Sequence, residues 1–380
     1  MMKSAARIAK VETFVAGMSC FVRLTTEDGV QGVGESTAFA FPKNVAEIIK
    51  SFEPFLIGAD AHDVEQNWLK MYRALGWRGL TLGGAISAID QACWDIRGRI
   101  FETPVWHLLG GRSRKAVRGM KVVFGATKED LLKESLAAQK EGFTAIKVIL
   151  HQHEHHGMRH AEKIADLVDR MAALRDAVGN TLDIGIELHR NMQPGNSIAL
   201  IKELMPYRPL FVEDPIPPDS VLSFGEVSAK VDTPMAAGER NTSIYEFREY
   251  IEHAGLSFVR PDIGLAGGFT HVRKICAMAE AHHQGVLPHA VPSGAIATMA
   301  HIHMGLTAPN WEAQEHMYQN VDPIQQMVKR IPIVKEGWLY PFDEPGLGME
   351  INDAFFATNP PVTVHGVKAD LREDGSVALR

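Results

Sequence analysis

The sequence predicts an α/β fold: a modified (β/α)8 TIM-type barrel with an α+β capping domain formed by the N-terminal region and the C-terminal tail. From about residue 118 onward, short apolar segments alternate with amphipathic stretches over about 230 residues, enough for eight β/α units. Within this region Glu187, Glu213 and Glu239 recur at intervals of 26 residues. That interval fits one strand, one helix and two loops.

The N-terminal part has the pattern of a separate small domain. Residues 7–40 are rich in Val, Phe and Thr and contain a Glu-Asp-Gly turn, which predicts antiparallel strands. Residues 44–110 carry apolar residues at spacings of three and four, as helices do, and end in Gly110-Gly111. We expect three regions: a cap over residues 1–117, the barrel over 118–344, and a segment over 345–380 that returns to the cap.

Eight segments of the barrel region have the composition of strands, and amphipathic stretches lie between most of them. The last connections are less regular than the others. The eight segments are 120–126, 144–150, 182–189, 210–216, 233–239, 257–263, 285–290 and 310–315.

Composition narrows the class of protein. The 380 residues are 46% hydrophobic and carry a net charge of −7, which argues against a nucleic-acid partner and against an anionic membrane surface. The three cysteines are scattered, the N-terminus lacks the apolar core of a signal peptide, and no stretch approaches the length of a membrane helix. We expect a cytoplasmic, homo-oligomeric enzyme that acts on a small molecule.

The three glutamates predict a metal site. Each ends an apolar segment, and in a β/α barrel those ends converge on the catalytic face. Three carboxylates in one place repel one another and resist burial, and a divalent cation resolves both problems. Oxygen ligands favour Mg²⁺ first and Mn²⁺ second. The alternative is three unrelated surface acids.

Two further strand ends carry a possible general base. Asp262 and His289 end the sixth and seventh segments, so they would be neighbours in a barrel. A carboxylate paired with an imidazole fixes its tautomer and raises its basicity, as a base requires. The alternative is a buried histidine satisfied by any acceptor.

His189 and Lys147 complete the candidate residues. His189 lies two positions after Glu187, and strand alternation would point both into the same cavity, where His189 could ligate the metal or serve as an acid. We favour the acid. Lys147 lies at the strand end one repeat earlier and could hold a substrate carboxylate, although an ordinary surface lysine fits the sequence equally well.

The loop after the second segment, residues 151–160, contains five histidines. A second transition-metal site is conceivable there. Because the histidines lack a fixed zinc-type spacing, we favour a polar lid or a solvated loop.

Beyond these single residues, the chain resembles the enolase superfamily, in its mandelate-racemase-like branch, and within it the D-galactonate dehydratases and related acid-sugar dehydratases. The resemblance covers nearly the whole length. It is carried by MYRALGWRG, SAIDQACWDIRG, PVWHLLGG, IELHR, FVEDPI, AAGER, RPDIGLAGG, PHAVPSG, WEAQE and PGLGMEI.

The resemblance implies a chemistry. It implies Mg²⁺ on the three glutamates and removal of the proton α to a carboxylate, giving a metal-stabilised enediolate. It implies that His289, with Asp262, is the base and that His189 protonates the departing 3-hydroxyl. It also implies that Glu315 hydrogen-bonds the substrate near the metal. The product of an aldonate, such as a galactonate-like acid, would be its 2-keto-3-deoxy acid.

Two departures from the pattern bear on this reading. Glu187 stands where these dehydratases commonly have Asp. Ile149 stands where many racemases of the superfamily have a second lysine as base, which argues against racemase or epimerase activity. An epimerase, a lactone cycloisomerase and a non-catalytic homologue that binds or regulates remain the alternatives.

Overall fold

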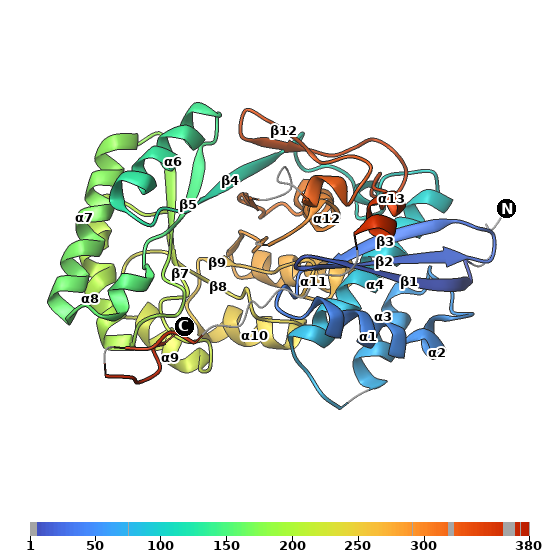
Figure 1. Ribbon diagram of the computed structural model, residues 1–380, viewed down its shortest axis with the longest axis horizontal. Helices are drawn as coiled ribbons and strands as arrows, with labels where there is room; N and C mark the ends of the chain where they lie inside the picture. The colour runs from blue at the N-terminus through green and yellow to red at the C-terminus, as the bar shows by residue number, and fades with distance from the viewer. Residues whose placement is uncertain are drawn as a thin grey trace.

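The computed structural model describes residues 6–74, 76–290, 292–317, 323–359, 369–372 and 374–379. It begins with an antiparallel sheet of three strands in the order β1-β2-β3, followed by helices that pack on one side of it (Figure 1). The elements are β1 Ile8–Ala16, β2 Ser19–Thr26, β3 Gln31–Ser36, α1 Pro42–Ser51, α2 Glu53–Leu56, α3 Val64–Ala74, α4 Leu80–Ile100 and α5 Val105–Leu108.

Glycine allows the sheet to lie directly on its longest helix. A Cβ atom at Gly34 of β3 would lie 1.9 Å from the carbonyl oxygen of Ala88 in α4, and one at Gly32 would lie 2.3 Å from that of Ala92. Only glycine permits so close an approach of two backbones. The sequence of β3 therefore fixes how α4 crosses the sheet.

Eight parallel strands follow. Their order is β4-β5-β6-β7-β8-β9-β10, and β11 pairs with β4. A parallel bridge between Val286 of β10 and Trp311, just before β11, joins the two ends of this order into a ring. The strands are β4 Val117–Val123, β5 Ala145–Ile149, β6 Asp183–Glu187, β7 Phe211–Glu213, β8 Met235–Ala237, β9 Phe258–Val259, β10 Gly285–Val286 and β11 Gln314–His316.

Helices follow most of these strands and cover the outside of the barrel (Figure 1). They are α6 Lys128–Lys140, η1 His153–His156, α7 His160–Val178, α8 Pro194–Leu204, η2 Met205–Tyr207, α9 Val221–Ser228, α10 Ile244–His253, α11 Gly268–Ala281 and α12 Ala295–Thr307. The predicted fold class is confirmed, and each of the eight predicted segments contains or overlaps a strand. None of the helices in the described ranges is long and apolar enough to cross a membrane.

The barrel interior is layered. A buried apolar cluster fills its lower part, comprising Met120, Ala145, Phe211, Ala236, Leu287 and Ala313. Side chains two residues further along a strand point to the same face, so the next layer above Ala145, Phe211 and Ala313 consists of Lys147, Glu213 and Glu315. The apolar layer thus supports a charged layer at the C-terminal ends of the strands.

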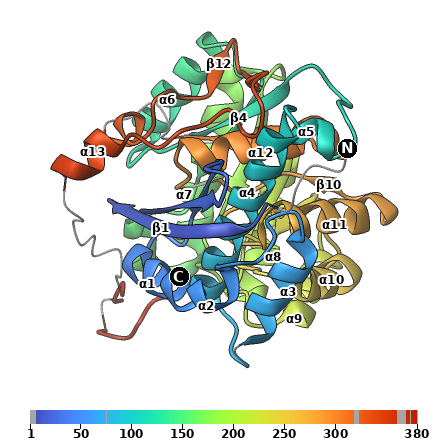
Figure 2. The ribbon, with the colours of Figure 1, turned by 90° about the vertical axis from the view of Figure 1, so that its right-hand side faces the viewer.

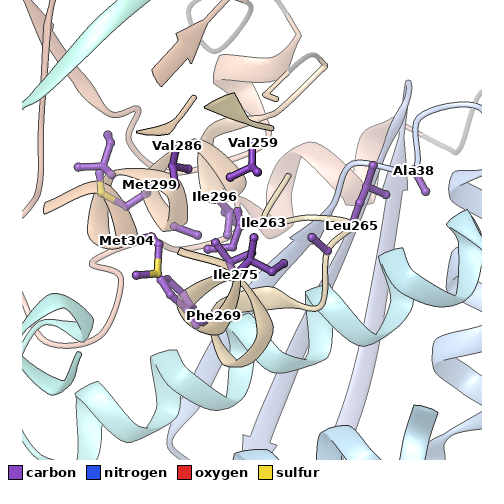
Figure 3. Close-up of a cluster of buried hydrophobic side chains, with 14 of the residues drawn as sticks. Ala38, Val259, Ile263, Leu265, Phe269, Ile275, Val286, Ile296, Met299 and Met304 are labelled. Carbon is purple, nitrogen blue, oxygen red and sulfur yellow. The ribbon is translucent and has the colours of Figure 1, made fainter. Parts of the chain in front are cut away.

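The cap packs on the loop that carries Asp262. Gln91 of α4 donates to the carbonyl of Ile263 at 3.2 Å, and Ser87 accepts from the amide of Gly267 at 2.8 Å. Apolar side chains from β9, β10, α11 and α12 gather beside this junction, and Ala38 approaches from the cap (Figure 3). The position of this loop therefore depends on the cap as well as on the barrel.

Buried acids of the cap meet two helices of the barrel. Glu35 of β3 accepts from the amides of Gly294 and Ala297 at the start of α12, at 2.8 and 2.9 Å. Asp90 of α4 accepts from the amide of Thr270 at the start of α11, at 3.0 Å. The first amides of a helix have no partner within the helix, and these amides and the helix dipole favour a carboxylate at such a position.

The C-terminal part contacts the cap. Leu347 donates to Asp95 of α4 at 2.8 Å, and Phe356 of α13 (Asp353–Thr358) packs on Phe14 of β1 with ring centres 5.2 Å apart. Figure 2 shows α13 beside the strands of the cap. A hairpin of β12 (Ile333–Lys335) and β13 (Trp338–Tyr340) extends the barrel sheet next to β4.

The division of the chain into residues 1–117, 118–344 and 345–380 stays a prediction. Part of the tail assigned to the cap, residues 360–368, lies outside the described residues.

We predict that Asp90→Asn changes how stability depends on pH. Burial raises the pKa of Asp90 from 3.8 to about 7, although hydrogen bonds from Thr270 oppose the shift. Between these values the folded wild type binds a proton that the unfolded chain has lost, so its stability falls as pH rises. Asparagine does not titrate, and it can still accept from Thr270.

The free energy of unfolding of Asp90→Asn, relative to wild type, should therefore rise by roughly 1–3 kcal/mol between pH 4 and pH 8. Urea unfolding at several pH values measures it. Asp176→Asn, on the exposed face of α7, is the control and should show no such rise. Parallel curves for Asp90→Asn and wild type would contradict the assignment of a neutral, buried Asp90.

Candidate metal and acid–base site

Three glutamates meet at the C-terminal ends of neighbouring strands. Glu187 and Glu213 end β6 and β7 and are fully buried, and Glu239 follows β8 by two residues. One carboxylate oxygen from each lies within 4.8 Å of the others. The even spacing in the sequence becomes a cluster because parallel strands end at the same edge.

Lys147 occupies the centre of the carboxylates. Its Nζ lies 3.2 Å from Oε2 of Glu187 and 2.9 Å from Oε2 of Glu213, and it also contacts Oε1 of Glu315. An ammonium group has three N–H donors, and these three contacts engage all of them. In this arrangement Lys147 is a counter-ion of the cluster, with no donor left for a substrate carboxylate.

Two arginines, which the sequence analysis did not identify, complete the charge balance. The fully buried Arg260 contacts Glu213 and Glu315 and donates to the carbonyl of Leu287 at 2.7 Å. Arg190 contacts Glu239 and lies 3.3 Å from Asp214. Arg260 lies two positions before Asp262 within the predicted segment 257–263, so its place there could have pointed to it, although β9 itself ends at Val259. Arg190 follows an irregular turn and gave no such signal.

The network holds excess negative charge. Six carboxylates share four buried basic groups, Lys147, Arg190, Arg260 and the imidazole of His289. The acids are Glu187, Glu213, Asp214, Glu239, Asp262 and Glu315. Burial, and then the neighbouring Glu187, raise the pKa of Glu213 to about 7 against the opposing effect of Arg260. A raised carboxyl pKa indicates negative charge that the surroundings do not fully compensate.

The other two glutamates of the cluster differ. Burial raises the pKa of Glu187, and Lys147 only partly offsets it. At Glu239 burial acts in the same direction, but Arg190 and His289 outweigh it and hold the pKa well below its usual range.

His289 and Asp262 form the expected pair. Nδ1 of His289 lies 2.8 Å from Oδ2 of Asp262, and Asp262 is itself held by the amide of Gly264 at 2.8 Å. Nε2 faces the carboxylate cluster, 3.6 Å from Oε2 of Glu239. Burial alone would lower the pKa of His289, but Glu239 and the bond to Asp262 raise it to about 9.

The strand argument for His189 is wrong. β6 ends at Glu187, and His189 has a φ of 50°, in the left-handed region, so alternation along a strand does not apply to it. In this turn the amide of His189 donates to Oε1 of Glu187 at 2.6 Å. Burial, and then Arg190, lower the pKa of His189 to about 4. Glu239 and Glu213 also act on this pKa, so the imidazole is within electrostatic reach of the cluster.

Glu315 is buried beside Lys147 and Arg260. Its Oε2 accepts from the amide of Ala290, one residue after His289, at 2.8 Å. Glu315 therefore ties the end of β11 to the segment that holds His289. It could still accept a further hydrogen bond, because a carboxylate has about four lone-pair sites.

The donor set of the cluster fits a hard divalent cation. Three carboxylates from separate strands converge, and all their potential ligand atoms are oxygen. The excess negative charge supplies the electrostatic reason for such an ion. Glu187, Glu213 and Glu239 would hold it.

Both halves of the chain match models of known families. Residues 6–110 match the mandelate racemase / muconate lactonizing enzyme N-terminal domain, and residues 130–355 match the enolase C-terminal domain-like family. The protein therefore belongs to the enolase superfamily, in its mandelate racemase-like branch, as the sequence motifs indicated.

Named relatives are dehydratases. The chain is 35% identical to a D-galactonate dehydratase of Ralstonia pickettii (strain 12J), over 88% of this chain and 89% of the relative. It is 34% identical, with the same coverage, to a D-galactonate dehydratase of Verminephrobacter eiseniae (strain EF01-2).

A solved structure is similar over almost the whole fold. It is an enolase of Agrobacterium radiobacter, provisionally named a galactarate dehydratase, bound to Na and L-malate. It superposes with a TM-score of 0.93 at 26% identity and covers 98% of this chain and 100% of its own.

We predict that Arg260→Met destabilises the protein in the absence of added metal. The substitution leaves Glu213 and Glu315 buried without their guanidinium partner, and breaking a buried pair costs roughly 3–5 kcal/mol. Thermal unfolding in a chelating buffer measures the loss. Arg248→Met, at an exposed site on α10, is the control. Equal melting temperatures for the two variants would show that Arg260 does not balance the acids.

Proposed function

We propose that the protein is a Mg²⁺-dependent sugar-acid dehydratase that converts an aldonate, such as a galactonate-like acid, to its 2-keto-3-deoxy product. The observation that carries the proposal is the His289–Asp262 pair facing the three-glutamate cluster, 3.6 Å from Glu239. The dehydratase names of relatives that align over 88% of the chain support the same reaction type.

Mg²⁺ is the proposed ion, with Mn²⁺ as a substitute, because the ligands are all carboxylates. When bound, it supplies positive charge that neutralises the negative charge building on the substrate carboxylate as the α-proton leaves. Bound to Glu187, Glu213 and Glu239, it would share with Lys147 the balancing of their charge. An ammonium group released from one glutamate gains a free N–H, which could then hold the substrate carboxylate.

The remaining steps belong to the two histidines. Nε2 of His289 accepts the proton from C2, while Asp262 holds Nδ1 and stabilises the imidazolium that forms. His189 donates a proton to the 3-hydroxyl, which leaves as water when the C3–O bond breaks. The resulting enol gains a proton at C3, loses the proton of its C2 hydroxyl and becomes the 2-keto acid.

Without metal or substrate, the protonation states of the two histidines are the reverse of those the reaction needs. A pKa of about 9 keeps His289 protonated at neutral pH, and a pKa of about 4 keeps His189 neutral. Glu239 is the charge that most raises the pKa of His289, and a cation held by Glu239 would offset that charge. An anionic substrate beside His189 raises the pKa of His189. The reaction therefore requires both metal and substrate to bring His289 and His189 to the protonation states it needs.

Separate features of the site argue against each of the alternative functions. A racemase or epimerase needs a second base on the opposite face of C2, and Ile149, at the end of β5, cannot take a proton. A lactone cycloisomerase has no need of a leaving-group acid at His189. A non-catalytic relative would not need the buried His289–Asp262 pair.

A screen of aldonic and aldaric acids tests the reaction. With Mg²⁺ present, at least one aldonate should yield a 2-keto product, and removal of metal by chelation should abolish it. C2–deuterium exchange without a keto product would favour an epimerase. Absence of both, across the library and with either metal ion, would favour a non-catalytic relative.

We predict different losses in two histidine variants. His289→Asn should lose both C2–deuterium exchange and dehydration, because no base remains. His189→Asn should lose dehydration by roughly 100-fold or more but keep C2 exchange, since enolisation needs no leaving-group acid. NMR of the substrate in D₂O with Mg²⁺ measures both.

His282→Asn, a histidine on the barrel exterior just after α11, is the control and should retain both activities. Exchange that survives in His289→Asn and disappears in His189→Asn would reverse the assignment and place the base after strand β6.

A further inference from the structure

A second group of possible ligands lies apart from the three glutamates. Nδ1 of His153 lies 3.4 Å from Oδ1 of Asp370, and Nε2 of His156 lies 3.8 Å from Oδ2 of the same residue. One potential ligand atom from each of the three lies within 4.8 Å of the others. Two residues come from the histidine-rich loop after β5, and the third comes from the C-terminal tail.

The local fold of the loop explains why His153 and His156 act together. Residues 153–156 form the 3-10 turn η1, and a 3-10 helix has three residues per turn. Side chains at positions i and i+3 therefore project from the same side. Although the histidines of the loop lack a zinc-type spacing in the sequence, two of them form a matched pair in this turn.

His155, the histidine between them, has a different role. Its Nε2 lies 2.9 Å from Oδ2 of Asp166 on α7, and its Nδ1 accepts from the amide of Gln152 at 2.8 Å. Arg170 braces the same turn through Asp166 at 2.6 Å and Glu154 at 2.9 Å. The turn is thus fixed to α7, and His153 and His156 are presented from a supported backbone.

From this geometry we infer that His153, His156 and Asp370 form a transition-metal site for an ion of the Zn²⁺ class. Two imidazoles and a carboxylate are ligands that Zn²⁺ uses, with water free to complete a tetrahedron. Nitrogen ligands select against Mg²⁺, whereas the all-carboxylate cluster favours it. The chain therefore carries two sites of different chemical preference.

The neighbouring residues set limits on this site. His153 is 76% exposed in its side chain, and Lys163 and Arg372 act electrostatically on His156. Exposure and nearby positive charge weaken the binding of a cation. The site should accordingly bind Zn²⁺ reversibly, unlike a buried structural site.

A buried histidine, His151, lies next to the site. The ring of His151 lies 5.1 Å from that of His156, and His151 is 3% exposed, with both ring nitrogens lacking a partner among the described residues. His189 contributes electrostatically to the pKa of His151, so His151 is within electrostatic reach of His189. An ion bound at the second site would tie the tail to the loop that follows β5, the strand of Lys147.

Zn²⁺ binding to untagged, metal-stripped protein in excess Mg²⁺ tests the inference. Isothermal titration should detect one Zn²⁺ per chain in wild type and in Glu213→Gln. His153→Gln, His156→Gln and Asp370→Asn should each bind at least roughly tenfold more weakly. His160→Gln, an exposed histidine outside the cluster at the start of α7, should bind as wild type does.

Hydrogen exchange provides a readout that does not depend on activity. Zn²⁺ should slow exchange in residues 151–157 and 369–372 of wild type, and should not do so in His156→Gln. Three results would overturn the inference: no Zn²⁺ binding by wild type, equal weakening in His160→Gln, or loss of binding in Glu213→Gln. The last would place the ion on the glutamate cluster.

Discussion

Buried carboxylates at the C-terminal ends of the strands outnumber the basic groups beside them, and this excess of negative charge governs the candidate site. Carboxylates removed from water must be paired or neutralised. Here the pairing is shared: Lys147 contacts three glutamates and Arg260 contacts two. The raised pKa values of Glu187 and Glu213 indicate that this pairing is incomplete. A divalent cation would remove the remaining imbalance and would change the protonation of His289 through Glu239.

The cap and the apolar floor of the barrel keep these charges in place. Phe211 fills the space beneath Glu187, where a side chain on Gly185 would collide with its ring at 2.3 Å. On the other side, α4 of the cap holds the loop of Asp262 through Gln91 and Ser87. The orientation of His289 therefore depends on a chain of contacts that begins in the cap. Two separate regions of the sequence must fold together before the pair can form.

The sequence predicted the features that follow from regular structure. Glu187, Glu213, Asp262 and His289 lie at or just beyond strand ends, so their spacing was enough to bring them to one edge of the barrel. Glu315 was indicated only by the resemblance to the family. It could not predict features that depend on side-chain direction or on irregular backbone. The engagement of Lys147 by three glutamates depends on side-chain direction. The left-handed turn at His189 depends on irregular backbone.

Contacts between distant segments were also beyond the sequence. Glu35 and Asp90 are acids in a strand and a helix, and only the docking of the cap shows that they meet the starts of α12 and α11. The pairing of η1 with Asp370 is of the same type. A 3-10 turn could not be distinguished from a solvated loop, and nothing in the sequence placed the tail beside it.

Anomalous diffraction from crystals grown with Mn²⁺ would show whether the three glutamates hold a divalent cation. We predict one strong manganese peak bonded to Glu187, Glu213 and Glu239 at about 2.1–2.2 Å, with Lys147 displaced from at least one of these carboxylates. The peak should disappear in Glu213→Gln. A crystal with Mn²⁺ in excess, no peak at the glutamates and Lys147 still bridging them would contradict the account.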